Sequence, residues 1–122
     1  MRYLCLIHLD EQKMAELPHE EMNDLNVRHL ALNERLLASG NLVEASALES
    51  SPKAVRLHIR SGRRTVVDGP FTETKELVAG FYLIEAGGME EAIAIASRFP
   101  SAALATIEVW PTRDLEVDEP PG

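Results

Sequence analysis

The spacing of apolar residues alternates along this chain between the period of a strand and the period of a helix. Strand-like segments occur at 3–9, 53–60, 63–68, 78–86 and 102–110, and helix-like patterns at about 18–39 and 89–99. The segments at 53–60 and 63–68 flank Ser61-Gly62, a short turn signal, so we expect a hairpin in the middle of the chain. Four of these five strand-like segments fit a β-α-β-β-α-β arrangement around the hairpin, in which both helices cover one face of a four-stranded antiparallel sheet.

The first predicted helix has the clearest pattern. Pro18 suits its first turn, where a missing N–H costs nothing, and Gly40-Asn41 supplies a left-handed stop. Its apolar stripe has alternating spacings of three and four and consists of Met22, Leu25, His29, Leu32 and Leu36. In the second helix we expect Ala92, Ile93, Ala96 and Phe99 to point inward. Pro100 ends that helix.

The face of the sheet opposite the helices is expected to be apolar and uncovered. Alternating strands would place roughly 10–15 apolar side chains there, which attracts a partner in water. The predicted fold class is therefore α+β, a ferredoxin-like protomer whose open face meets a second copy across a two-fold axis. This predicts a homodimer or a higher oligomer. The alternative is a monomer with an unusually apolar surface.

Length and composition limit the other possibilities. The 122 residues suit one domain at 1–111, followed by an acidic, Pro-rich tail at 112–122. No apolar segment reaches the roughly 18–20 residues that cross a bilayer, and the start does not resemble a secretory signal, so we expect a cytoplasmic protein without membrane contact. The formal charge of −8 argues against nucleic acid as a partner. Cys5 is the single cysteine, in an apolar strand, and is expected to be buried and inert.

Two residues are candidates for acid–base chemistry. His29 lies in the middle of the apolar stripe, where a group that titrates near neutrality would be partly desolvated. The alternative is a core histidine that is hydrogen-bonded to a backbone carbonyl. Asp68 ends a strand just before Gly69-Pro70, and its alternative role is that of a turn former. The other histidines lack the spacing of a metal site, so we expect no bound metal.

Several segments resemble the DGPF branch of the YCII-related family. They are Val67–Glu76 (VDGPFTETKE), Gly80–Ile84 (GFYLI), the opening Met1–Ile7 (MRYLCLI) and the closing Ile107–Pro111 (IEVWP). The resemblance covers about residues 1–111. It implies a dimeric α/β barrel of ferredoxin-like protomers, with a cleft between helix and sheet lined by a His and an Asp suspected of being an acid–base pair.

The resemblance transfers to two positions. Arg28-His29-Leu30-Ala31 matches the His-Leu-Ala segment of the family's first helix, and Asp68 matches the aspartate of the DGPF motif. In shorter relatives the suspected aspartate belongs instead to an Asp-Pro near the second helix, where this chain has Phe99-Pro100. The catalytic pair predicted here is therefore His29 and Asp68, with Asp68 orienting the imidazole so that its other nitrogen acts as a base.

The residues expected to bind a ligand lie around this pair. Arg56, together with Arg63 or Arg64, would hold an anionic group, and Phe71 and Tyr82 would form apolar walls. Solvated hairpin charges and core packing are the alternative interpretations. Because no Gly-rich phosphate loop is present, no nucleotide cofactor is expected.

Three hypotheses about function remain. The first is a cofactor-independent enzyme of the lyase or isomerase type that acts on a small carbonyl or acidic compound. The second is a non-catalytic module that binds a small ligand or a protein and is linked to transcriptional regulation, because relatives in this branch are often associated with sigma factors. The third is a dimerisation scaffold without a site.

Overall fold

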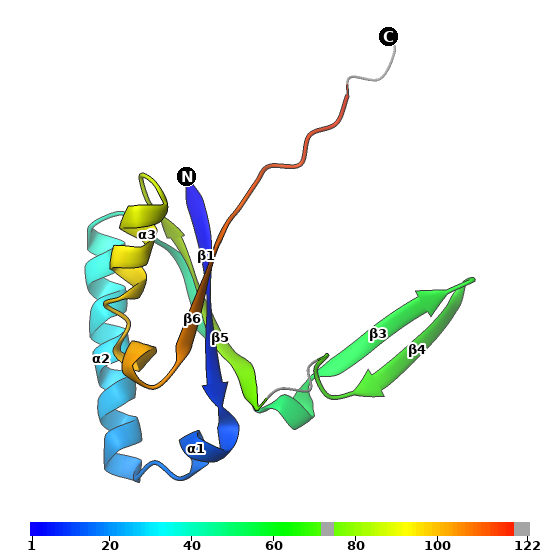
Figure 1. The fold of residues 1–122 in the computed structure, drawn as a ribbon, viewed down its shortest axis with the longest axis horizontal. Coiled ribbons are helices and arrows are strands. Elements are labelled where there is room, and N and C mark those ends of the chain that lie inside the picture. The colour runs from blue at the N-terminus through cyan, green and yellow to red at the C-terminus, as the bar shows by residue number, and fades with distance from the viewer. Residues whose placement is uncertain (72–74, 119–122) are drawn as a thin grey trace.

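The computed structural model describes residues 1–71 and 75–118. Its main unit is a four-stranded antiparallel sheet in the order β2-β5-β1-β6, with two helices on one face (Figure 1). In chain order these elements are β1 (Arg2–Asp10), α2 (His19–Ala38), β2 (Leu42–Ala47), β5 (Glu76–Glu85), α3 (Met89–Ala96) and β6 (Thr106–Pro111). Sheet and helices follow the β-α-β-β-α-β order, which confirms the predicted ferredoxin-like fold class.

The core lies between this sheet and the two helices. Alternate residues of β1 point toward the helices and are buried, from Tyr3 to Leu9. Leu32 and Leu36 of α2 pack against them, as do Ala92 and Ile95 of α3. The predicted stripe of α2 is confirmed, because Leu25, Leu32 and Leu36 are buried while the flanking Leu30 and Leu37 are exposed. Gly40 follows the helix with φ of 80°, the left-handed conformation expected of a helix stop.

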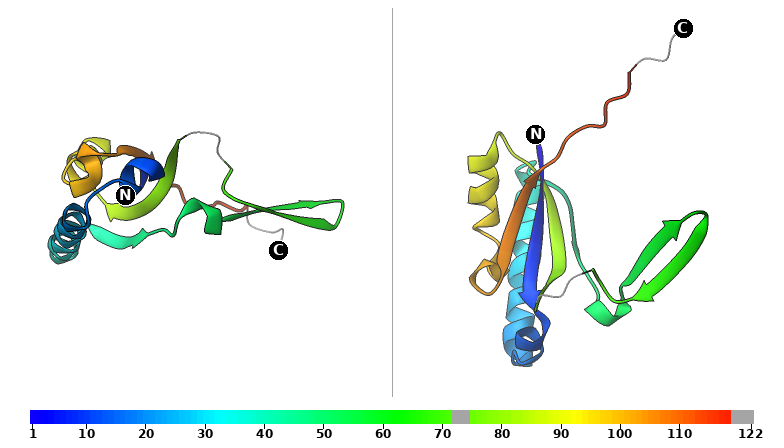
Figure 2. Two further views of the ribbon diagram at one scale, coloured as in Figure 1. Left: turned by 90° about the horizontal axis from the view of Figure 1, so that it is seen from below. Right: turned by 45° about the vertical axis from the view of Figure 1, so that its right-hand side comes forward.

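The predicted central hairpin exists, but its place in the sheet was wrong. Strands β3 (Val55–Arg60) and β4 (Arg63–Asp68) pair only with each other and form a separate two-stranded ribbon. We call β3 and β4 together the arm. In Figures 1 and 2 the arm extends from the end of the sheet, on the side away from α2 and α3.

The strand that takes the hairpin's place in the sheet is β2, which the sequence pattern did not reveal. After Leu42 and Val43 its residues are small or polar, and they show no clear alternation. The strand pairs with β5 through its backbone. The pairing is close at Gly80, where an added Cβ would lie 2.9 Å from the carbonyl oxygen of Ser46. A glycine at this position therefore lets β2 approach the sheet.

Smaller differences concern the ends of elements. A short helix, α1 (Glu11–Ala15), follows β1, and the Asp10 side chain caps its first N–H groups. Helix α3 ends at Ala96 and turns Ile95 inward, whereas Ile93 is exposed. The 3₁₀ turn η2 (Pro100–Ala103) delays the start of the last strand to Thr106, and a second such turn, η1 (Ser51–Lys53), precedes β3.

Within the described residues, no helix lies on the second face of the sheet. We call it the open face, and its apolar side chains include Leu4, Leu6, Phe81, Leu83 and Trp110, which the strand register places side by side. One polar pair lies among them, between His8 Nε2 and Glu108 Oε1 at 3.0 Å. Within the described residues no helix is long and apolar enough to span a membrane. Thr72, Glu73 and Thr74 of the DGPF segment, and residues 119–122 at the end of the predicted tail, lie outside the described residues.

Candidate functional site

A hydrogen-bonded chain of three side chains joins α2 to β5. His29 Nδ1 lies 2.8 Å from the hydroxyl oxygen of Tyr82, and this hydroxyl donates in turn to Oδ1 of Asn33. His29 and Asn33 are four residues apart on α2, so both side chains lie on the same face of the helix. Tyr82 reaches them from the neighbouring strand β5.

The tyrosine ring is held in place from its other side. It stacks on Phe99, with ring centroids 4.2 Å apart and planes inclined by 24°. Tyr82 is only 4% exposed and Phe99 only 2%. Because the ring is fixed by the core, its hydroxyl group is presented to His29 in a defined position.

The direction of these hydrogen bonds defines the state of the histidine. A phenol has one O–H, and here Tyr82 uses it toward Asn33. Its oxygen therefore accepts a hydrogen bond from His29, which places the ring proton on Nδ1. No residue in 1–71 or 75–118 hydrogen-bonds to Nε2, so this nitrogen keeps its lone pair. An imidazole in this state is suited to accept a proton.

The electrostatic environment of His29 also favours its neutral form. Burial lowers the pKa of His29 below its ordinary 6.5, and the adjacent positive charge of Arg28 lowers it further. Burial also raises the pKa of Tyr82 to about 12, against a smaller opposing effect of its bond to Asn33. At neutral pH the site thus contains a neutral imidazole and a neutral phenol.

The lowered pKa of His29 predicts a loss of stability in acid. The unfolded chain, with an ordinary histidine pKa of 6.5, binds this proton more tightly than the folded chain does. The free energy of unfolding should therefore decrease as the pH falls below about 7, until the folded-state pKa is passed. Urea unfolding at pH 7.5, 6.5 and 5.5 should show this slope in the wild type and a smaller one in His29→Gln.

A matched control is His19→Gln, because His19 is exposed in the first turn of the same helix. This variant should keep the slope of the wild type. Equal slopes for His29→Gln and the wild type would contradict the effect of burial on His29.

The structure brings together only two of the predicted site residues, His29 and Tyr82. Asp68 is exposed at the end of β4, and no hydrogen bond or ion pair joins it to His29. Arg56 and Arg63 also belong to the arm, and Phe71 just beyond it is 84% exposed. The Nε of Arg56 is buried and has no hydrogen-bond partner among the described residues. The pairing of Asp68 with His29 remains a prediction.

Sequence reasoning missed Asn33. The sequence feature that could have identified it is its position four residues after His29, on the edge of the apolar stripe. An amide beside an apolar stripe has no special meaning until a strand residue reaches it, and the partner Tyr82 is 49 residues away in sequence. Tyr82 was predicted as an apolar wall, and the structure adds a hydrogen-bonding role for its hydroxyl group.

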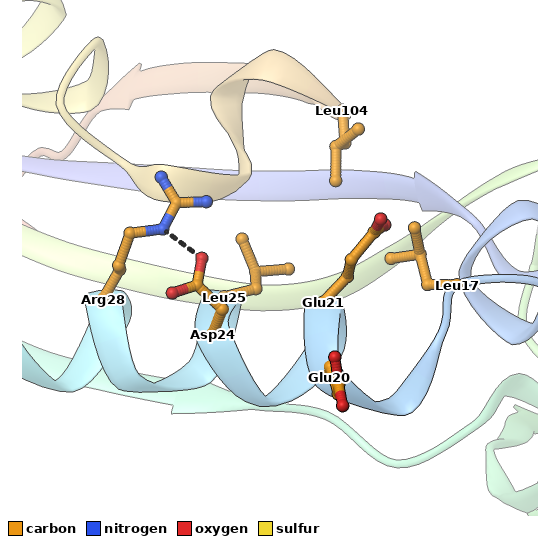
Figure 3. A pocket seen from close by; sticks show the side chains of 7 residues that line it. All are labelled: Leu17, Glu20, Glu21, Asp24, Leu25, Arg28 and Leu104. Carbon is orange, nitrogen blue, oxygen red and sulfur yellow. Dashed lines mark ion pairs between the residues drawn. The ribbon is translucent and has the colours of Figure 1, made fainter.

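Two pockets lie outside this chain of hydrogen bonds, next to α2. One, of about 370 Å³, is lined by the N-terminal half of α2, by Leu17 just before this helix and by Leu104 (Figure 3). Its charged residues include Asp24 and Arg28, whose ion pair measures 3.1 Å. The second, of about 360 Å³, lies further along α2 beside Pro100. Among the described residues no group of three or more His, Cys, Asp or Glu is arranged to hold a metal ion.

The sheet order and the helices on one face define a ferredoxin-like protomer. The chain belongs to the YCII-related domain family, whose sequence profile matches residues 1–116. It is 33% identical over 110 residues to an uncharacterized protein of Rhizobium meliloti (strain 1021), covering 87% of this chain and 86% of that protein.

A solved structure has a similar fold. It is the 5-chloro-2-hydroxyhydroquinone dehydrochlorinase TftG of Burkholderia phenoliruptrix AC1100, in complex with 2,5-dihydroxybenzoquinone. The TM-score is 0.53, the identity 19%, and the match covers 93% of this chain and 94% of TftG. At this identity the likeness shows a shared fold.

Proposed function

We propose that this protein is a cofactor-independent enzyme in which His29 is the general base, acting on a small carbonyl or acidic compound in a lyase-type or isomerase-type reaction. The observation that carries the proposal is the hydrogen-bonded chain from His29 through Tyr82 to Asn33. It occupies Nδ1 and leaves Nε2 unbonded within the described residues. A base held in one tautomer and one orientation is what proton abstraction requires.

The neutral state of both rings supports the proposal. Because the pKa of His29 is lowered, the imidazole is unprotonated at neutral pH and ready to accept a proton. When Nε2 takes up a proton, the resulting imidazolium still donates from Nδ1 to the hydroxyl oxygen of Tyr82, which favours the charged form. Tyr82 keeps its own proton because its pKa is raised to about 12.

The arm residues have roles in this proposal that depend on their approaching the site. Arg56 and Arg63 are candidates to hold an anionic group of the substrate, with Phe71 and Tyr82 beside it. Asp68 is a candidate second acid–base group. All but Tyr82 lie on or next to the arm, away from His29 in the protomer.

We also infer that the protein works as a cytoplasmic homodimer. The support is the open face, where Leu4 lies between Leu83 and Trp110, and Leu6 lies beside Phe81. Trp110 is 53% exposed in the protomer, a large apolar surface for a lone chain. A second copy against this face would cover these side chains on both protomers at once.

Proton exchange into heavy water tests the enzymatic proposal without a known substrate. The protein is incubated in D₂O near neutral pH with small 2-oxo acids, 1,3-dicarbonyl compounds and dihydroxybenzoquinones, the last chosen by analogy of fold with TftG. Loss of carbon-bound proton signals in NMR spectra reports abstraction. We expect accelerated exchange for at least one class of compound, retained in His19→Gln and lost in His29→Gln.

Two outcomes would oppose this function. Exchange that survives in His29→Gln would show that another group is the base. A compound that binds, as seen from shifted protein signals, but exchanges no proton in any class would favour the non-catalytic ligand-binding module.

A further inference from the structure

We propose that the arm clasps a second copy of this chain, laying its apolar side against the body of that copy while the two open faces meet. This inference rests on the homodimer in the proposed function and assigns a role to the arm. The arm belongs neither to the four-stranded sheet nor to its core.

The arm has one apolar side and one polar side. The register pairs Leu57 with Val66 and His58 with Thr65, so these pairs point in opposite directions. The apolar side carries Val55, Leu57, Ile59 and Val66, which are between 53% and 60% exposed, and the register adds one charged residue near each end, Asp68 and Arg64. The other side carries Arg56, His58, Arg60 and Thr65 among its residues.

Such a ribbon is not expected to be stable without a covering surface. An isolated two-stranded hairpin is at best marginally stable in water, and a packed face is what stabilises it. Nothing in the described protomer packs on the apolar side of the arm, since its four side chains stay more than half exposed. Exposed apolar side chains that lie together in this way indicate a surface that contacts another molecule.

The direction in which the arm extends indicates which molecule covers its apolar side. In Figures 1 and 2 it extends on the side of the sheet away from α2 and α3, which is the side of the open face. Its six-residue strands span roughly 20 Å, while stacked sheets lie about 10 Å apart. A second copy seated on the open face would therefore lie within reach of the arm. By two-fold symmetry its own arm would reach back.

The distribution of charge along the chain also supports a second copy as the partner of the arm. Residues 55–68 hold four of the chain's twelve Lys and Arg but only one of its twenty Asp and Glu, a formal charge of +3. The net charge of −8 then leaves −11 on the rest of the chain. The basic arm of one copy is attracted to the acidic body of the other, whereas contacts between two arms or between two bodies are repulsive. These charges therefore favour the orientation in which each arm lies on the partner's body.

Neighbouring valines provide a matched test. Val66 lies on the apolar side of the arm and Val67, paired with Arg56, on the opposite side. In sedimentation experiments over a range of protein concentrations, Val66→Ser should raise the dimer dissociation constant roughly tenfold or more, since each change acts twice in a symmetric dimer. Val67→Ser should stay within about twofold of the wild type. Leu57→Ser should behave as Val66→Ser does.

A second measurement follows the arm directly. Ile59→Cys, labelled with a polarity-sensitive thiol dye, reports whether the apolar side is covered. Cys5 is buried and its pKa is raised to about 11, so it should not compete for the label near neutral pH. We expect an apolar dye environment at high protein concentration and a polar one when dilution separates the copies.

The outcomes distinguish the proposed clasp by the arm from the open-face dimer itself. A wild-type dimer that is unaffected by Val66→Ser and Leu57→Ser, with a dye signal independent of concentration, would overturn the clasp and leave the open-face dimer standing. A wild-type monomer at micromolar concentration would overturn both. An apolar dye environment in that monomer would place the arm on its own chain instead.

Discussion

Replacing His29 with glutamine is expected to lower kcat/KM about 10²–10⁴-fold on a compound identified by proton exchange, which is the usual contribution of a general base. The imidazole is hydrogen-bonded at Nδ1 and free at Nε2 among the described residues, so its removal takes away the proton acceptor. Steady-state kinetics at several pH values measures the effect. In the wild type, kcat/KM should rise with pH and level off above a midpoint below 6.5, because burial lowers the pKa of His29.

Two further variants distinguish a base from a merely structural residue. Tyr82→Phe removes the acceptor of the Nδ1 proton and should reduce kcat more than it changes KM, while the pH midpoint shifts. His19→Gln, on the exposed first turn of α2, should leave rate and pH profile unchanged. If kcat/KM of the His29→Gln variant still fell at low pH as in the wild type, a group other than His29 would be responsible for that decrease.

The fold was largely predictable because apolar periodicity reports burial against the helices. The stripe of α2 and the apolar strands β1 and β5 follow from it, since Leu36, Cys5 and Ile84 are fully buried. The error concerned β2 and the arm. Periodicity cannot tell a strand within a sheet from one in a ribbon, and the alternation of β3 made it the better candidate for the sheet.

The site was predictable only in part, for a similar reason. A histidine in an apolar stripe is visible in the sequence, and its burial with a lowered pKa followed. Its partners depend on which strand passes beneath it. Because β5 rather than the hairpin is the neighbour of β2, Tyr82 reaches His29, while Asp68 lies on the arm.

The second large effect concerns the core that supports this site. Leu36→Ala is expected to lower the free energy of unfolding by about 2–5 kcal/mol, the range for truncating a buried leucine. Leu36 is fully buried two turns after His29 on the same face of α2. Its loss leaves a cavity between helix and sheet. Urea unfolding at one fixed protein concentration, high enough to keep any dimer intact, measures the change.

Leu37→Ala supplies the matched control for this measurement. Leu37 is the next residue of the same helix and is 66% exposed, so both variants change helix propensity equally and differ in burial. Its loss should cost less than about 1 kcal/mol. If the two variants lost equal stability, the face of α2 that packs on the sheet would be assigned wrongly. His29 would then no longer point toward Tyr82, because Leu36 and His29 occupy the same stripe and must turn inward together.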